Sequence, residues 1–307
     1  MQNVFITGAS GCIGHYVVEA LAERSDCHLY LFLRNPQKLA LALDPERVTI
    51  VQGDLLQIEQ QAELLRQMDV AIHLVAAWGG EAISRAVNVT KTLALFDLLD
   101  RDRCQKILYF STASLLDRQN QPVAVAGRAG TEYIRTKYEM LMRRDEAKLR
   151  DRLVTLYPTL VFGGSERHPH SHIAGGLKDV MRWLGLIRFF KADGSFHFMH
   201  AEDIAKIVVH LFESSVREGD WVLGQPALHV NDCIEQVCHF YHKRIYFRLP
   251  LPIRLGRTLA VLFGAKLSEW DDYCLAHRHF VHKAVDPPTF NLPSSYPTVA
   301  SLLQQYG

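Results

Sequence analysis

The chain has 307 residues, of which 48% are hydrophobic and 22% charged, enough for one large domain or two unequal domains with a sizeable core. This composition excludes a disordered chain or a fibre, and a formal net charge of +1 gives no basic footprint for binding nucleic acid. No run reaches the roughly 18 apolar residues of a transmembrane helix. Six scattered cysteines without a Cys-x-x-Cys pair, and no leader before the first apolar run, predict reduced thiols in a cytoplasmic protein.

The first half of the sequence alternates short apolar runs with stretches of helical periodicity. Strands are predicted at residues 4–6, 29–33, 48–51, 70–76, 107–110 and 153–156. Helices are predicted from residue 13 onward and at 59–68, 88–99 and 133–149. Strands that alternate with helices form a parallel sheet covered by helices on both faces, so the predicted fold class is α/β with a doubly wound parallel sheet.

The alternation weakens after Pro158, where segments become shorter and richer in proline, tryptophan and tyrosine. We expect residues 1–163 to form one domain, to which residues 199–224 return. Residues 164–198 and 225–307 are expected to form a smaller C-terminal lobe that covers the site of a small-molecule substrate.

Three glycines in a Gly-x-x-Gly-x-x-Gly pattern separate the first predicted strand from the first predicted helix. Gly8 permits the tight bend, Gly11 lets the backbone approach a pyrophosphate, and Gly14 lets the helix pack close to the sheet. The helix N-terminus then offers unpaired N–H groups to the phosphates. In this context the pattern predicts a Rossmann-type dinucleotide-binding turn rather than a purely structural bend. The residues expected to contact the cofactor here are Gly8, Ser10, Gly11, Cys12, Ile13 and Gly14.

The end of the second predicted strand indicates which dinucleotide is bound. An acid about twenty residues beyond the glycines would hold the ribose hydroxyls of NAD, whereas this chain has Arg34, with Lys38 nearby. Because arginine binds a phosphate through two hydrogen bonds, we predict NADP, with NAD less favoured. A solvated loop charge is the alternative for Arg34. Asp54, followed by Leu55, is expected either to contact the adenine or to cap a turn.

Further motifs follow in a fixed order. They are Gly53-Asp54-Leu55, His73-Leu74-Val75-Ala76-Ala77, Asn88-Val89, Phe110-Ser111-Thr112-Ala113-Ser114, Tyr133-x-x-x-Lys137, Tyr157-Pro158-Thr159 and Phe198-Met199-His200-Ala201-Glu202-Asp203. With the glycine turn, this set resembles the extended short-chain dehydrogenases/reductases, in the NAD(P)-dependent epimerase/dehydratase group, over residues 1 to about 225. The resemblance implies that Ala76, Ala77, Asn88 and Pro158 also contact the cofactor.

Tyr133 and Lys137 are one helical turn apart and so lie on one helix face. A tyrosine phenol has a pKa of about 10, which a nearby ammonium lowers. Tyr133 is therefore predicted to exchange a proton with a carbonyl or an alcohol. The resemblance implies that Lys137 also binds the nicotinamide ribose and that Thr112 holds the substrate oxygen.

These residues predict an NADP-dependent oxidoreductase that interconverts a carbonyl and an alcohol on a small organic substrate. An epimerase or dehydratase that keeps and recycles its NAD(P) is the first alternative, and a non-catalytic dinucleotide-sensing or assembly factor is the second. Two departures from the family pattern argue against a sugar-nucleotide substrate. Tyr157 stands where the family often has arginine, and Leu116-Asp117 stands where it usually has Tyr-Gly.

Three remaining features receive a structural interpretation. His168, His170 and His172 alternate in a predicted loop. Without cysteine or acidic ligands nearby, we expect solvated side chains or contacts near the substrate mouth, and no metal site. Asp203 is expected to cap the helix that follows it. Residues 249–263, a proline-rich entry and an apolar stretch, suggest either a hydrophobic substrate or packing within the smaller lobe or at a homodimer contact.

Overall fold

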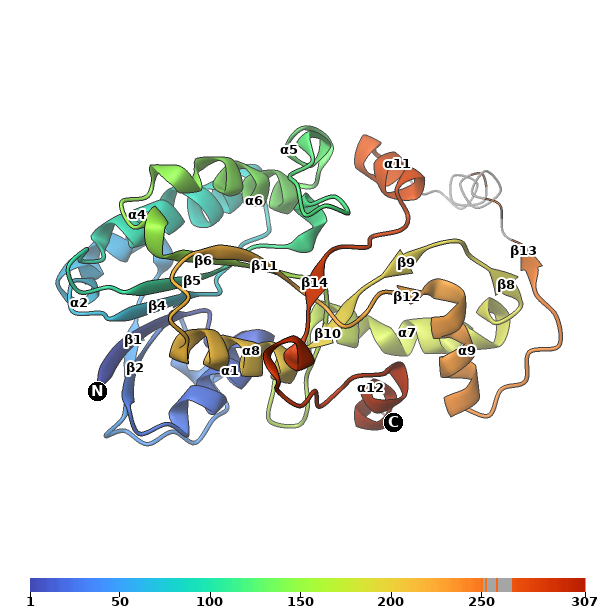
Figure 1. The fold of residues 1–307 in the computed structure, drawn as a ribbon, viewed down its shortest axis with the longest axis horizontal. Coiled ribbons are helices and arrows are strands. Elements are labelled where there is room, and N and C mark those ends of the chain that lie inside the picture. Colours follow the sequence, from blue (N-terminus) through green and yellow to red (C-terminus); the bar gives the residue numbers. More distant parts are fainter. Residues whose placement is uncertain (251, 253–257, 259–266, 307) are drawn as a thin grey trace.

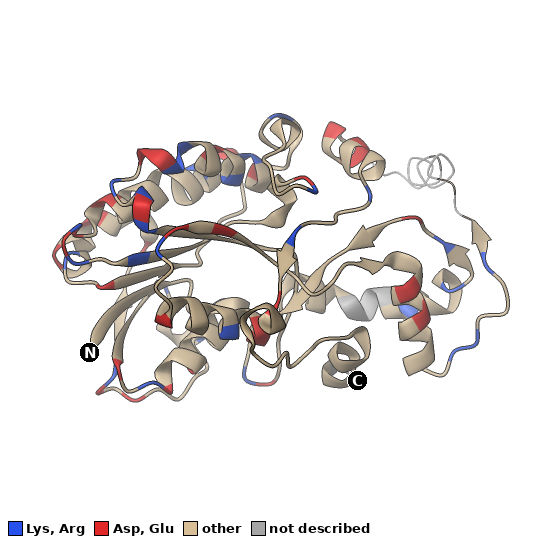
Figure 2. Cartoon of the chain, viewed as in Figure 1, with Lys and Arg blue, Asp and Glu red and all other residues tan. Residues whose placement is uncertain are grey.

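The computed structural model describes residues 1–250, 252, 258 and 267–306 (Figure 1). Nearly all of the apolar stretch within 249–263 lies outside the described residues, so its predicted role is not addressed. Within the described part of the chain, no helix has the length and apolar character needed to cross a membrane. Acidic and basic residues are interleaved along the outer helices (Figure 2), in line with the net charge of +1.

A parallel sheet forms the centre of the fold, and the described residues give it eight strands in the order β14-β11-β6-β5-β4-β1-β2-β3. Every neighbouring pair in it is parallel. Its strands are β1 (Gln2–Thr7), β2 (Cys27–Leu33), β3 (Val48–Gln52), β4 (Val70–His73), β5 (Lys106–Phe110), β6 (Leu153–Pro158), β11 (Gly219–Leu223) and β14 (Ala284–Val285). The predicted α/β fold class with a doubly wound parallel sheet is confirmed.

Helices cover both faces of this sheet, which explains the continuous apolar runs of the strands (Figure 1). Val4 and Ile6 pack toward α1 and α8, while Phe5 between them packs into the cluster on the opposite face. The helices of the two faces are α1 (Cys12–Ala22) and α8 (Ala201–Glu213), and α2 (Ala62–Leu65), α4 (Thr92–Leu98) and α6 (Glu132–Arg143).

Smaller elements gather beyond the carboxyl ends of the strands, on the right in Figure 1. The short strand pairs are β7 (Leu160–Phe162) with β10 (Phe198–His200), β9 (Ser195–Phe196) with β12 (Leu228–His229), and β8 (Phe190–Lys191) with β13 (Leu249–Pro250). The remaining α-helices of the described residues are α3 (Glu81–Arg85), α5 (Ala124–Ala129), α7 (His172–Ile187), α9 (Val230–Phe240), α11 (Glu269–Ala276) and α12 (Val299–Tyr306). The division into two lobes stays a prediction, and β14, from the stretch expected in the smaller lobe, pairs with β11 in the main sheet.

Three predicted elements are longer than the observed ones. The helix expected over 133–149 ends at Arg143, after which the chain turns and buries Ala147 and Leu149 in the core. The strand expected over 70–76 ends at His73: the N–H of Leu74 still bonds to the carbonyl of Thr7 in β1, but Ala77 is bonded to the side chain of Asn88. The helix expected over 59–68 is replaced by a 3-10 helix, Leu55–Gln61, followed by the single turn of α2.

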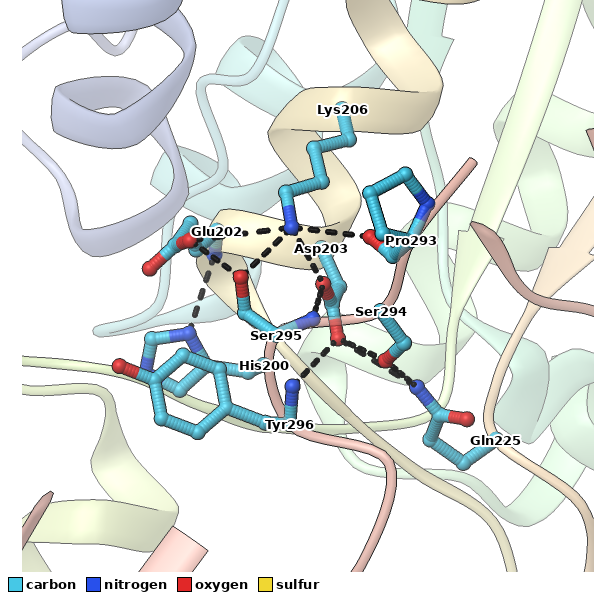
Figure 3. Close-up of polar contacts among 9 residues, drawn as sticks. All are labelled: His200, Glu202, Asp203, Lys206, Gln225, Pro293, Ser294, Ser295 and Tyr296. Carbon is cyan, nitrogen blue, oxygen red and sulfur yellow. Dashed lines mark hydrogen bonds and ion pairs between the residues drawn. The ribbon is translucent and has the colours of Figure 1, made fainter. Parts of the chain in front are cut away.

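Asp203 joins α8 to a segment ninety residues further along the chain (Figure 3). Its carboxylate is fully buried and accepts hydrogen bonds from the hydroxyl of Ser294 (2.6 Å) and the backbone N–H groups of Ser295 (2.7 Å) and Tyr296 (3.1 Å). The ammonium of Lys206 lies 3.4 Å from the same carboxylate. The expectation that Asp203 caps α8 is wrong, because the ring of His200 accepts the N–H of Glu202 and is the N-cap.

Replacing Asp203 by alanine is expected to lower the free energy of unfolding by about 3 kcal/mol, because three donors lose their fully buried acceptor. Urea unfolding followed by circular dichroism measures this loss. Glu202→Ala is the matched control, since its carboxylate is 39% exposed and accepts one hydroxyl, that of Ser295. A cost below about 1 kcal/mol is expected there, and equal costs for both variants would contradict the proposed anchoring role of Asp203.

Candidate active site

A cavity of about 930 Å³ opens at the carboxyl ends of β1, β2, β4, β5 and β6. It lies where the strand order changes direction, between β1 and β4, which is where open α/β sheets bind ligands. The residues predicted as site residues that line it are Gly8, Ser10, Gly11, Cys12, Ile13, Gly14, Arg34, Lys38, Asp54, Leu55, Ala76, Ala77, Thr112, Tyr133, Lys137 and Pro158.

The glycine turn is built by close backbone contacts. Gly8 has a φ of +77°, which favours glycine, and its carbonyl accepts the N–H of Gly11 at 3.0 Å. A Cβ on Gly14 would lie 2.1 Å from that same carbonyl oxygen. Gly11 is the N-cap of α1 and provides no side-chain acceptor, which leaves the first-turn N–H groups of this helix for a ligand.

His15, near the start of α1, holds the glycine turn in place through its imidazole ring. Its Nε2 accepts the N–H of Ala40 at 3.2 Å, so its Nδ1 carries the proton and donates to the carbonyl of Gly11 at 3.0 Å. Burial lowers the pKa of His15 and so favours this neutral form. Nothing in the local sequence pattern separates His15 from an ordinary helix position.

The end of the cavity beside β2, called the nucleotide end after the sequence prediction, carries two exposed cations. Arg34 follows β2 and Lys38 ends a short 3-10 helix, Pro36–Lys38. Within the described residues, neither side chain is in an ion pair, so both are available to an anionic ligand. The carboxylate of Asp54 accepts the N–H of Leu56 at 2.9 Å, as expected if Asp54 caps a turn. Asp54 also lines the cavity.

Asn88 is fully buried and is not among the lining residues of this cavity. Its Oδ1 accepts the N–H of Ala77 at 2.8 Å, and its Nδ2 donates to the carbonyl of Ala77 and to the hydroxyl of Thr136, both at 3.0 Å. The amide therefore positions Ala77, which does line the cavity. The predicted direct contact between Asn88 and a cofactor has no support in this geometry.

Tyr133 and Lys137 both face the cavity from the first turns of α6. The ammonium of Lys137 donates to the carbonyl of Phe110 at 2.8 Å and to the hydroxyl of Tyr109 at 3.2 Å. Burial raises the pKa of Tyr133 to about 12 and lowers the pKa of Lys137 to about 7. The expected lowering of the Tyr133 pKa by Lys137 is therefore wrong for this structure, because desolvation dominates and the ammonium is bound elsewhere.

Thr112 follows β5 and lines the cavity. Its hydroxyl accepts the N–H of Ser114 at 3.3 Å and so caps a short 3-10 helix, Ala113–Leu115. Its Oγ1 also lies 3.3 Å from the hydroxyl oxygen of Ser114. A substrate oxygen at Thr112 would compete with these long hydrogen bonds.

Trp78 is a site residue that the sequence motifs do not indicate. Its ring stacks on that of Tyr133, with centroids 4.7 Å apart and planes at 29°, and meets the ring of His172 edge to face at 5.5 Å. It also lines the cavity. Because Trp78 directly follows the Ala76-Ala77 motif in the sequence, that motif could have predicted its position beside the cavity. No sequence pattern predicts that Trp78 stacks on Tyr133.

The three alternating histidines have separate roles. His170 and His172 line the cavity, as the substrate-mouth alternative expected. His168 is buried rather than solvated: its ring stacks on Tyr16 at 4.0 Å, and its Nε2 lies 2.9 Å from the carboxylate of Glu19. Over the described residues, no three His, Cys, Asp or Glu side chains are grouped so as to hold a metal ion.

Comparison with curated proteins finds partial matches in much longer chains. The protein is 34% identical over 113 residues to the hybrid PKS-NRPS synthetase gkaA of Penicillium citrinum, which is 32% of this chain and 3% of that synthetase. It is 23% identical over 232 residues to the synthetase pvhA of Talaromyces variabilis, of which the match covers 6%. The chain thus spans a small fraction of the length of these relatives.

Solved structures match over nearly the whole chain. The enzyme WbmG of Bordetella bronchiseptica, in complex with NAD and UDP, has a TM-score of 0.67 at 13% identity, covering 99% of this chain and 94% of that one. The UDP-N-acetylglucosamine 4-epimerase of Methanobrevibacter ruminantium has a TM-score of 0.69 at 16% identity, covering 99% and 98%. At these identities the matches show a shared fold.

The family comparison covers the larger part of the chain. Residues 4–224 match the model of the NAD dependent epimerase/dehydratase family. This stretch contains the glycine turn, Thr112, Tyr133 and Lys137, all of which line the cavity. The resemblance seen in the sequence motifs is confirmed, and the chain belongs to the NAD dependent epimerase/dehydratase family of short-chain dehydrogenase/reductase-type enzymes.

Proposed function

We propose that this chain binds a nicotinamide dinucleotide in the cavity and acts as an epimerase or dehydratase that regenerates its cofactor in each cycle. The observation that supports this most is that the glycine turn, Tyr133 and Lys137 share one cavity in a chain of this family. The family favours this function over the net oxidoreductase expected from the sequence alone. A non-catalytic sensor is disfavoured, since the proton-transfer residues line the cavity.

The residues present fit a dinucleotide. The uncapped N-terminus of α1 suits a pyrophosphate, and the tight packing at Gly14 brings that helix end against the turn. A bound nicotinamide would take up hydride from the substrate and give it back. Tyr133, whose hydroxyl has no hydrogen-bond partner among the described residues, would exchange the proton at the substrate oxygen. Thr112 would hold the same oxygen, and Lys137 would bind the ribose.

We further propose that the dinucleotide is NADP, on the strength of Arg34 and Lys38. The double variant Arg34→Ala/Lys38→Ala is expected to bind NADP about tenfold more weakly, because exposed charge-assisted contacts to a phosphate contribute modestly. Affinity for NAD is expected to change less than about twofold, since NAD lacks the 2′-phosphate. Calorimetric titration of both nucleotides measures this, with Arg101→Ala, an exposed cation outside the cavity, as control. Equal losses for NAD and NADP would contradict the assignment.

The basic pair also supports a second candidate, an NADP-dependent oxidoreductase with net turnover, since NADPH serves cells as a reductant. The fate of the cofactor separates the two functions. Denatured protein is analysed for released nucleotide, and native protein is incubated with a panel of carbonyl compounds and alcohols. Recycling predicts bound nucleotide and product formation without net change in NADPH absorbance. Stoichiometric NADPH loss would favour the oxidoreductase, and failure to bind either nucleotide would contradict both functions.

A further inference from the structure

The two ends of the cavity differ in charge. The charged lining residues are Arg34, Lys38 and Asp54 at the nucleotide end, and Lys137 beside Tyr133. The ammonium of Lys137 is already bonded to the carbonyl of Phe110 and the hydroxyl of Tyr109. Beyond Tyr133, no charged side chain lines the described cavity.

Apolar side chains fill that far end of the lining. Trp78 is 53% exposed, Ile83 41%, Ile173 40% and Leu160 38%, although all four are large and apolar. Exposed apolar side chains that gather at the opening of a cavity are typical of a ligand-binding surface. The site therefore presents water-accessible apolar surface next to the proposed proton donor.

Trp78 is held in place by the residue before Tyr133. The carboxylate of Glu132 accepts the N–H of Gly79 at 2.6 Å and of Gly80 at 2.9 Å. Both glycines have positive φ, +113° and +118°, a conformation that other residues adopt only with strain. These hydrogen bonds lower the pKa of Glu132, so its carboxylate stays charged at neutral pH.

Two ion pairs extend this attachment. Arg135 of α6 pairs with Glu81 of α3, and Arg85 of α3 lies 2.8 Å from Glu139 of α6. The segment from Trp78 through α3 is thus fixed to the helix that carries Tyr133. The indole consequently forms a preset wall beside the phenol rather than a freely rotating surface side chain.

Among the described residues, the far end offers no cationic side chain to an anionic group. The N-terminus of α7 lies there, but Ser171 caps it, with its hydroxyl accepting the N–H of Ala174 at 3.1 Å. The polar lining residues of this stretch are His170, Ser171 and His172. A nucleoside diphosphate placed here would lose its hydration without gaining a guanidinium or a free ammonium from the described lining residues.

We propose that the cavity beyond Tyr133 is a subsite for an uncharged substrate with a flat apolar or aromatic body, and that Trp78 forms its specificity-determining wall. This rests on the proposed function, since it assigns the substrate class of the same site. It separates this chain from its structural neighbours named for UDP-sugars, whose substrates carry a diphosphate. The ring faces and edges of Trp78 and His172 offer stacking contacts to such a body.

The test uses a matched pair of probes that differ in charge, 2-acetylnaphthalene and 2-naphthoate, together with UDP-glucose. Each is titrated calorimetrically into the 307-residue chain, with and without saturating NADP. The ketone is expected to bind at least about tenfold more tightly than the carboxylate, because the carboxylate is desolvated without a partner. When NADP saturates the nucleotide end, UDP-glucose is expected to give no binding heat. Tighter binding of either anion, or no binding of the ketone, would overturn the proposal.

Variants then locate the binding. Trp78→Ala is expected to weaken ketone binding about tenfold and Trp78→Phe about twofold, since a smaller ring retains part of the stacking. Glu132→Gln is expected to fall between them. Glu146→Gln is the control, because its carboxylate pairs with Arg143, and it is expected to leave the affinity unchanged. NADP affinity, measured in the same samples, should be unaffected. If the unmodified protein did not bind NADP, the proposed function would be wrong. If Trp78→Ala bound the ketone as tightly as the unmodified protein, only the proposed subsite would be wrong.

Discussion

Replacing Tyr133 by phenylalanine is expected to lower kcat about 1,000-fold, because positioned acid–base groups contribute about 10²–10⁴-fold. The ring remains in its stack with Trp78, and only the hydroxyl is lost. Affinity for the dinucleotide is therefore expected to stay within about twofold of the unmodified protein. Steady-state kinetics on the best substrate of the carbonyl and alcohol panel, together with nucleotide titration, measure both quantities.

Tyr138→Phe is the matched control, since Tyr138 lies on the same helix but is not among the residues lining the cavity. It should retain full activity. Because burial raises the pKa of Tyr133 to about 12, the phenol stays protonated at neutral pH. Activity in the direction that needs a proton donor should therefore not fall on account of Tyr133 until the pH approaches that value. If Tyr133→Phe kept more than about a tenth of kcat, Tyr133 would not be the proton donor.

Replacing Gly14 by alanine is expected to disrupt the start of α1. The added Cβ would lie 2.1 Å from the carbonyl oxygen of Gly8 and 2.8 Å from the Cα of Ala9, both backbone atoms that cannot rotate away. The helix must move off the sheet, at a cost of about 3 kcal/mol or more in the free energy of unfolding. Chemical unfolding measures the stability, and a drop in NADP affinity of at least about 100-fold should accompany it.

Gly11→Ala separates the two roles of the turn. A Cβ there would meet only the carbonyl oxygen of Gly8, at 3.3 Å, so stability should change by less than about 1 kcal/mol. Nucleotide affinity should still fall about tenfold or more if the pyrophosphate approaches this backbone. Unchanged affinity in Gly11→Ala would place the phosphates elsewhere, and an unchanged stability in Gly14→Ala would contradict the packing itself.

Local sequence pattern was sufficient for six of the eight described strands and for the glycine turn that lines the cavity. Uninterrupted apolar runs, such as that around Phe5, predict strands covered on both faces, and three glycines at fixed spacing predict the turn that follows. These features depend on neighbours within a few residues. The same holds for the placement of Tyr133 and Lys137 on one helix face.

Features that depend on distant partners could not be predicted. Helical periodicity continued past Arg143, but burial of Leu149 against the sheet ended the helix. Aspartate is a residue type that often caps a helix N-terminus, yet three hydrogen-bond donors to Asp203 lie about ninety residues further along the chain. The stack of Trp78 on Tyr133 likewise joins a loop and a helix that no local pattern relates.

The attachment of residues 294–296 to Asp203 bears on the order in which the protein is completed during synthesis. Strands β1 to β6 are all made within the first 158 residues, so the nucleotide half of the cavity can assemble early. The loop at Gly164, however, is held by the side-chain amide of Gln305, 3.0 Å from its carbonyl oxygen. The segment that follows Gly164 and contributes His170, His172 and Ile173 to the cavity therefore depends on a residue translated 141 positions later. A nascent chain would complete the β1–β6 side of the cavity before this segment is held in place.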